Sequence, residues 1–245
     1  MPSNPSPPNL PPPDLAQALS DWLAGPRSRA LRRARIGLRH RVLEVGCGHG
    51  LVTADLRRRA AGSVVTLDPG PSAADLAARA EHLPFRDSSF DLVFFQNVLL
   101  WVSPLEAALR EAARVLAPGG DLVALEPDYG GLLEHPSLGL GDLWRAGLTR
   151  AGADPCVGRR LPALCETAGL QVWVELAHLP QPASPAALRL LEGLPLTAAE
   201  LLQVAEAHRA LENKPSLWGV FVHVPYVIVV AGKPSAAGHL RRGAD

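Results

Sequence analysis

Apolar residues along this chain gather in short runs separated by segments of helical spacing. Four runs are continuous enough to be strands covered on both faces of a sheet. They lie at 42–45, 63–67, 91–95 and 121–125. Segments 51–60 and 107–116 carry apolar positions at helical spacing, and Pro-Gly-Gly closes the second. This alternation predicts parallel βαβ units with helices on both faces of the sheet.

The flanking segments predict further elements. A helix is expected from Asp14 to Ala24, ended by Gly25-Pro26, and the arginine-rich segment 27–41 after it is typical of a solvated helix face. Beyond the fourth run we expect a helix around Trp144, a helix at 161–168, a strand at 171–177, helical segments over 183–211 interrupted near Gly193 and Pro195, and a final strand at 220–231.

Three glycines, Gly46, Gly48 and Gly50, follow the first predicted strand at alternate positions. Without β-carbons they let the backbone turn sharply and approach a ligand. The loop alone leaves other interpretations open. Dinucleotide-binding dehydrogenases use a related loop, and a strand-helix turn without any ligand also needs glycine.

Two carboxylates narrow this choice. Asp68 ends the second strand about 20 residues beyond the loop, where an acidic side chain accepts hydrogen bonds from ribose hydroxyls, although a turn-forming Asp before Pro69 is the structural alternative. Glu44 lies inside the first strand, where an unpaired charge would cost several kcal/mol. A carboxylate there makes sense if it orders the loop amides or meets a cationic ligand group, whereas a dinucleotide pyrophosphate would be repelled.

Three segments, in this order, resemble the motifs of one family. Val42–Gly50 is similar to motif I of class I S-adenosylmethionine (SAM)-dependent methyltransferases. Glu81–Val93, with Leu-Pro-Phe and Phe-Asp, resembles their adenine-side segment, and Arg114–Val123 resembles their helix-turn-strand motif with Pro-Gly-Gly. Coincidence would have to imitate both order and spacing. The chain is therefore identified as a member of this family, similar to the type 11, UbiE-like small-molecule methyltransferases.

The resemblance implies an α/β fold: a Rossmann-like, doubly wound, mostly parallel seven-stranded sheet with an antiparallel last strand and a helical lid insertion. We expect a disordered Pro-rich tail at 1–13, one methyltransferase domain at 14–232 and a flexible tail at 233–245. Lid elements are expected at about 130–165 and 181–215.

The resemblance also implies a SAM site. Glu44 would order the loop near the methionine end, the loop backbone would contact methionine and ribose, and Asp68 would bind the ribose hydroxyls. Two residues on the adenine side and two after the strand 91–95 complete the set. The cofactor-binding residues are thus expected to be Glu44, Gly46, Cys47, Gly48, Asp68, Pro69, Ala80, Glu81, Gln96 and Asn97.

Two features depart from the family pattern. Arg79 stands where an Asp usually meets the adenine amino group, so that hydrogen bond is lost or is taken over by Glu81. In addition, the segment between Asp68 and Leu-Pro-Phe has room for a third strand near Asp75–Ala78 but hardly for a crossover helix.

Candidates on the acceptor side follow the later strands, where ligands bind in open α/β sheets. Trp101, Tyr129 and His135 are the substrate candidates, with core packing as the alternative for Trp101 and surface loop roles for the other two. Methyl transfer needs a general base only if the nucleophile arrives protonated, and the pattern assigns no catalytic residue.

Composition favours a small organic acceptor. The chain has 245 residues, 47% of them apolar, and a formal net charge of zero, so no overall field draws it to nucleic acid or to an anionic membrane. Three cysteines without metal-ligand spacing predict no disulfide framework and no metal site, as in a reducing cytoplasm. Arginine far outnumbers lysine, which is typical of a GC-rich bacterial genome.

Two alternatives remain beside SAM-dependent methyl transfer. The first is a non-catalytic SAM-binding regulator or partner subunit, which Arg79 and the short crossover segment leave open. The second is a nicotinamide-dependent oxidoreductase, in which Glu44 and the downstream motifs would have no role. Nothing in the pattern specifies an oligomeric state.

Overall fold

The strands build one large sheet and a small one. The computed structural model describes residues 10–70, 73–177, 183, 185–214 and 216–235. Its strands are β1 (Arg41–Val45), β2 (Ser63–Asp68), β3 (Leu76–Ala77), β4 (Phe90–Gln96), β5 (Leu116–Pro127), β6 (Leu133–His135), β7 (Gln171–Ala177), β8 (Phe221–His223) and β9 (Tyr226–Gly232). Seven of them form a sheet in the order β3-β2-β1-β4-β5-β9-β7, in which β9 is antiparallel to both neighbours. The predicted fold class is therefore confirmed.

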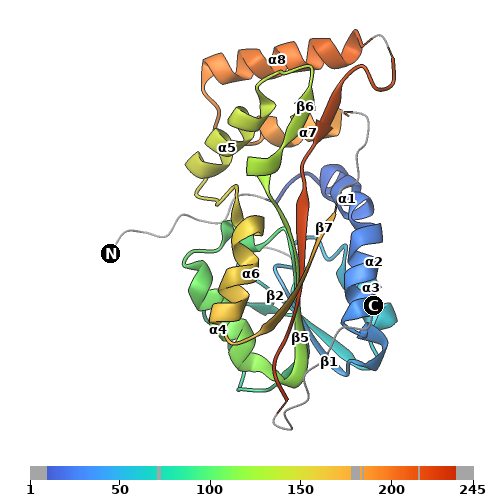
Figure 1. Ribbon diagram of the computed structural model, residues 1–245, viewed down its shortest axis with the longest axis vertical. Helices are drawn as coiled ribbons and strands as arrows, with labels where there is room; N and C mark the ends of the chain where they lie inside the picture. Colours follow the sequence, from blue (N-terminus) through green and yellow to red (C-terminus); the bar gives the residue numbers. More distant parts are fainter. Residues whose placement is uncertain (1–9, 71–72, 178–182, 184, 215, 236–245) are drawn as a thin grey trace.

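Helices cover both faces of this sheet (Figure 1). The described helices are α1 (Pro13–Trp22), α2 (Ala24–Arg33), α3 (Thr53–Arg59), α4 (Leu105–Val115), α5 (Leu140–Arg150), α6 (Val157–Thr167), α7 (Pro185–Glu192) and α8 (Ala198–Glu212), with 3-10 turns η1 (Ile36–Leu38), η2 (Leu99–Trp101) and η3 (Tyr129–Gly131). None of these helices is both long and apolar enough to cross a membrane.

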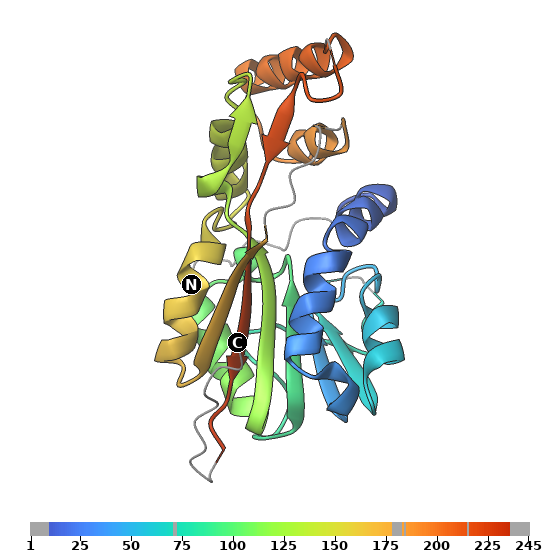
Figure 2. The same ribbon diagram turned by 45° about the vertical axis from the view of Figure 1, so that its right-hand side comes forward.

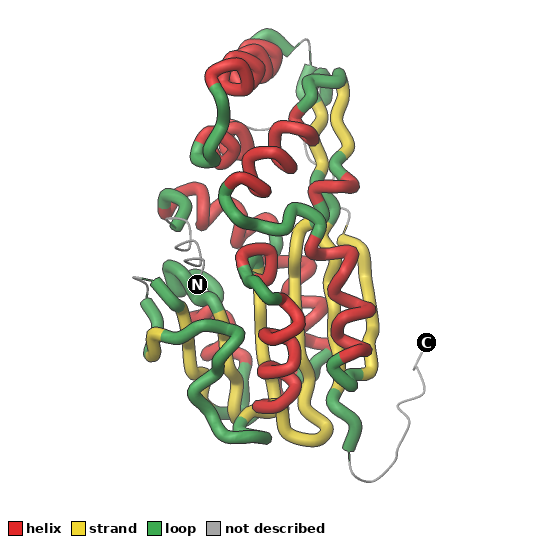
Figure 3. The backbone as a smooth tube through the Cα atoms, turned by 90° about the vertical axis from the view of Figure 1, so that its left-hand side faces the viewer, coloured by secondary structure: helices red, strands yellow, loops and turns green. Residues whose placement is uncertain are grey.

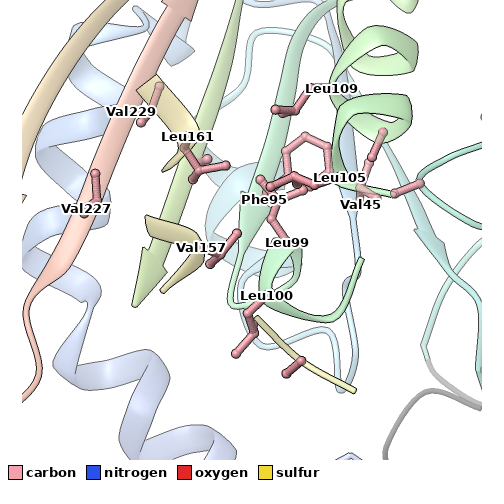
Figure 4. Packing of buried hydrophobic residues seen from close by; sticks show 14 of the residues in the cluster. Val45, Phe95, Leu99, Leu100, Leu105, Leu109, Val157, Leu161, Val227 and Val229 are labelled. Carbon is pink, nitrogen blue, oxygen red and sulfur yellow. The ribbon is translucent and has the colours of Figure 1, made fainter. Parts of the chain in front are cut away.

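Strand β4 shows why a continuous apolar run is needed. Leu92 and Phe94 belong to the cluster under α2 and α3, whereas Val93 and Phe95 belong to the cluster under α4 and α6. Successive strand residues point to opposite faces, so both sets must be apolar when both faces are covered. Figure 4 shows the second cluster, with side chains from β4, α4, α6 and β9 in one layer.

A cap stands above the carboxyl ends of the parallel strands (Figures 2 and 3). It consists of α5, α7, α8 and the two-stranded sheet of β6 and β8. The first predicted lid segment, about 130–165, divides between the two layers, because α5 lies in the cap while α6 packs on the main sheet. The helical segment 183–211 is interrupted as predicted, between α7 and α8.

Two predicted boundaries were wrong. The expected final strand at 220–231 is split, because Pro225 has no N–H to continue a ladder, and β8 pairs in the cap while β9 pairs in the main sheet. Gly25-Pro26 does not end the first helix. It lies in the first turn of α2, where a proline costs no hydrogen bond, and α1 already ends at Trp22.

The predicted third strand is confirmed as β3, whose two residues are both exposed. Within the described residues between β2 and β3 there is no crossover helix. The predicted tails lie largely outside the described residues, which begin at Leu10 and end at Ser235.

Substitution of Phe95 tests whether helices bury this face of the sheet. Its side chain is fully buried, so Phe95→Ala should lower the free energy of unfolding by about 3–5 kcal/mol through lost burial and a residual cavity. Leu176 on β7 is 54% exposed, and Leu176→Ala should cost less than about 1 kcal/mol. Chemical denaturation of both variants measures this, and similar losses would contradict the assigned burial.

Candidate active site

The predicted cofactor residues come together at the carboxyl ends of β1, β2 and β4. A cavity of about 690 Å³ lies there, bounded by the glycine loop below and the cap above. All ten predicted cofactor residues line it: Glu44, Gly46, Cys47, Gly48, Asp68, Pro69, Ala80, Glu81, Gln96 and Asn97. This convergence is what parallel strands ending at one edge produce.

The glycine loop is shaped by its backbone. Gly46 has a φ of +75°, and a Cβ on it would lie 2.3 Å from a methyl carbon of Val98. Its N–H donates to the Leu67 carbonyl oxygen at 2.6 Å, which ties the loop to the end of β2. A larger residue at this position would therefore strain the backbone and displace the turn after β4.

Glu44 is a buried carboxylate in the cavity wall. The Thr53 hydroxyl donates to its Oε2 at 2.6 Å, and 3% of the residue is exposed. Burial raises the pKa of Glu44 to about 7, against the weaker opposing effects of that hydrogen bond and of the charges on Arg57 and Arg27. The site thus holds a carboxylate that a cationic group would help to ionise.

Asp68 holds the glycine loop closed from the neighbouring strand. The Gly48 N–H donates to its Oδ2 at 2.9 Å, and the Gly70 N–H donates to its Oδ1 at 3.0 Å. Each carboxylate oxygen can accept more than one hydrogen bond, so both remain capable of accepting one from a ligand in the cavity. Asp68 therefore combines a structural and a binding capacity.

Arg79 and Glu81 pair with each other in the cavity wall. The Arg79 Nη2 donates to Glu81 Oε1 at 2.8 Å, and Glu81 is buried while the Arg79 side chain is 38% exposed. The residue that departs from the family pattern is thus neutralised by its neighbour. Ala80 lies between them in the sequence and is buried, so its methyl group gives this end of the cavity a small apolar surface.

The turn after β4 is braced from three sides. Asn97 has a φ of +58°, and its Oδ1 accepts from the Tyr226 hydroxyl at 2.9 Å. Gln96 Oε1 accepts from Arg27 Nη1 at 3.2 Å. The side chains of Gln96 and Asn97 are therefore engaged by α2 and β9.

Glu126, at the end of β5, supplies the third brace. Its Oε1 accepts from the backbone N–H groups of Val98 and Leu99 at 2.9 and 3.0 Å. The residue is fully buried, and burial raises its pKa to about 7. In the described part of the chain its Oε2 has no hydrogen-bond partner.

The structure separates the three acceptor-side candidates. Trp101 and Tyr129 line the cavity, and Tyr129 stacks on Trp144 with ring centroids 4.8 Å apart. His135 is exposed on β6 and lines neither this cavity nor the smaller one in the cap. Burial raises the pKa of Tyr129 well above its usual range, so at neutral pH the phenol is a hydrogen-bond donor and not a base.

Several lining residues were missed by sequence reasoning. They come from α1, from the cap and from β9, and they include Leu19, Trp144, Leu190 and Tyr226. The chain before α1 also reaches the site, since Pro11 O lies 2.9 Å from His49 Nε2. The apolar face of α1 can be seen in the sequence, but the sequence does not show which distant segments this face packs against.

Comparison with known proteins points to one class. A methyltransferase domain family model matches residues 43–124. Methyltransferase GfsG of Streptomyces halstedii is 28% identical over 224 residues, which cover 82% of this chain and 77% of that protein. The malonyl-[acyl-carrier protein] O-methyltransferase of Erwinia pyrifoliae is 40% identical over 118 residues, 43% of this chain and 44% of that protein.

Among solved structures, phosphoethanolamine N-methyltransferase 2 of Haemonchus contortus, in complex with S-adenosylhomocysteine, has a similar fold. The TM-score is 0.58 at 15% identity, over 91% of this chain and 58% of that one. The fold and the order of the motifs agree with this family match, and the three together support a class I SAM-dependent methyltransferase. Residues 43–124 match the methyltransferase domain family.

The raised pKa of Glu44 predicts how the stability of the unliganded protein depends on pH. Its pKa of about 7 in the folded state exceeds the ordinary value of 4.5, so the stability associated with the protonated form is lost as pH rises through 7. Glu44→Gln cannot ionise. The gain in unfolding free energy of Glu44→Gln over wild type should therefore be larger at pH 8 than at pH 5, by about 2 kcal/mol.

Denaturation at the two pH values measures this difference. Glu206, which is exposed on α8, provides the matched control, and Glu206→Gln should differ little from wild type at either pH. An equal gain for Glu44→Gln at pH 5 and pH 8 would show that Glu44 is ionised without penalty.

Proposed function

We propose that this protein transfers a methyl group from SAM to a small organic acceptor held beneath the cap. The observation that carries the proposal is that one cavity has both an acidic part and an aromatic part. Buried carboxylates, Glu44 and Asp68, line the part next to the glycine loop, and aromatic side chains, Trp101, Tyr129 and Trp144, line the part next to the cap.

The residues present fit a SAM molecule. Glu44 is buried against a neutral hydroxyl and would gain a counter-charge from the ligand's ammonium group. The backbone of Gly46, Cys47 and Gly48 would follow the methionine and ribose portions. Asp68, with Pro69 beside it, would accept hydrogen bonds from the ribose hydroxyls through its remaining lone pairs.

The other end of the site fits the adenine. Ala80 offers a small apolar surface, and Glu81 keeps one oxygen paired to Arg79 while the carboxylate lines the cavity. On the methionine side, the backbone of Gln96 and Asn97 would face the ligand, because their side chains are already bound to Arg27 and Tyr226.

When bound, SAM supplies an activated methyl group, which joins a lone pair of the acceptor while the sulfur keeps the electrons of the broken bond. The chain's own task is to hold the acceptor in line and exclude water. The cap and α1 cover the cavity for this purpose. Tyr129, which stays protonated, would orient the acceptor by donating a hydrogen bond.

A small molecule is also the partner that the charge balance supports. The formal net charge is zero, and phosphate backbones need a basic surface. We further propose a reducing cytoplasm as its location, since the odd number of cysteines and their lack of metal-ligand spacing argue against a disulfide framework.

The competing proposal is a SAM-binding regulator without turnover. It is favoured by the Arg79–Glu81 pair, which alters the adenine side, and by the missing crossover helix in the described residues between β2 and β3. Against it, the cavity continues past the carboxylates into the aromatic part, and a regulator that binds only SAM has no use for space to hold an acceptor.

Asp68→Ala tests the cofactor assignment. Loss of hydrogen bonds to a charged group costs roughly 1.5–3 kcal/mol, so the dissociation constants of SAM and of its demethylated product should both rise about 10- to 100-fold. Asp142→Ala on α5, where the carboxylate is 85% exposed, should leave both unchanged. Calorimetry on folded variants decides, and an unaltered affinity in Asp68→Ala would remove the ribose role.

Turnover separates the enzyme from the regulator. With radiolabelled methyl-SAM and a panel of small phenols, quinones and amines, wild type should release the demethylated product in proportion to methylated acceptor. Asp68→Ala should need higher SAM concentrations for the same rate. Tight binding of SAM with no transfer to any acceptor would instead support the regulator.

A further inference from the structure

A second cavity, of about 250 Å³, lies inside the cap. Its walls come from α1, α5, α7, α8 and β8, which are elements far apart in the sequence (Figures 1 and 2). Leu15 and Ala18 of α1 line it together with Ala187 of α7 and Leu211 of α8. No motif of the methyltransferase family includes these residues, so the cavity is a property of this chain's cap.

The two cavities share a wall. Leu19, Tyr129, Trp144, Leu190 and Tyr226 line both of them. The two phenols and the indole form the aromatic part of this shared wall, with Tyr129 stacked on Trp144. The cap cavity therefore adjoins the cofactor cavity at these five residues.

The cap cavity is built for an uncharged occupant. Among the described residues that line it there is no Asp, Glu, Lys or Arg. Its polar side chains are the phenols of Tyr129 and Tyr226 and the imidazole of His223, and the Tyr226 hydroxyl already donates to Asn97. An anion placed here would lose its hydration and meet no Lys or Arg, and a cation would meet no Asp or Glu.

The wall is also poor in hydrogen-bond capacity. Apart from those three rings, its described side chains are Leu, Ala, Val and Trp. Such a surface binds apolar carbon skeletons by burying them from water, and its aromatic members favour flat ones. A malonyl group, named in the acyl-carrier relatives, ends in a carboxylate that meets no Lys or Arg here.

We propose that the acceptor of this enzyme is an uncharged, mainly apolar molecule whose body occupies the cap cavity and whose nucleophilic atom lies at the shared wall, beside Tyr129. The inference rests on the proposed methyl transfer and adds the substrate class to it. Arg189, which lines the cofactor cavity, is paired with Asp14 at 2.9 Å and does not line the cap cavity, so it offers no anion site within it.

A neutral fluorescent probe tests the occupant. N-phenyl-1-naphthylamine, measured with the full chain saturated with S-adenosylhomocysteine, should bind and brighten in the cap cavity. Ala187→Phe fills that cavity from α7 and should weaken dye binding at least tenfold. Ala199→Phe, at an exposed position of α8, adds the same side chain outside the cavity and should leave dye binding unchanged.

A second variant guards against misfolding. Ala18 is exposed on α1 at the edge of the cavity, so Ala18→Trp should narrow it without disturbing the core and should weaken dye binding in the same way. None of these alanines lines the cofactor cavity, and S-adenosylhomocysteine affinity should stay unchanged in all three variants. Undiminished dye binding in both Ala187→Phe and Ala18→Trp would overturn the proposal.

Charge is tested by a matched pair of competitors. 2-Naphthol should displace the dye at concentrations at least tenfold lower than 2-naphthoate, which differs mainly in its carboxylate. Equal displacement by the two would overturn the uncharged class. Failure of S-adenosylhomocysteine to bind wild type would count against the proposed function itself, whereas cofactor binding without dye binding would count only against this inference.

Discussion

The buried carboxylate of Glu126 organises the turn on which the site depends. By accepting the N–H groups of Val98 and Leu99, it fixes the backbone directly after β4. Val98 then fills the space that only a glycine at position 46 can leave, so the glycine loop and this turn determine each other's shape. Asn97, held by Tyr226, links the same turn to the junction with the cap.

Burying acidic groups at this point has an energetic cost. Glu44 and Glu126 both have pKa values raised to about 7 by desolvation, which means that each destabilises the folded chain once it is ionised. Active sites commonly combine such shifts with a ligand that reverses them. Glu44 lines the cavity and can meet a cation, whereas Glu126 lies behind the turn and acts on the backbone alone.

The antiparallel strand β9 connects the two layers. Tyr226, its first residue, lines both cavities, and the strand then runs down between β5 and β7 through the core. The preceding residues, Phe221–His223, belong to the cap sheet. A single segment therefore couples the position of the cap to the main sheet, and Pro225 provides the break between them.

Features that are local in the chain follow from the amino-acid sequence alone. The apolar runs predicted the strands, and Gly46, Glu44 and Asp68 lie at strand positions or strand ends, whose meeting at one edge follows from parallel topology alone. Tertiary structure decided the rest. Leu19, Trp144 and Tyr226 come together only through packing of distant segments, and His135, which pairs with Phe221 in the cap sheet, lines neither cavity. Periodicity specifies which face of an element is buried, but the partner that buries it is set by long-range contacts that no local pattern contains.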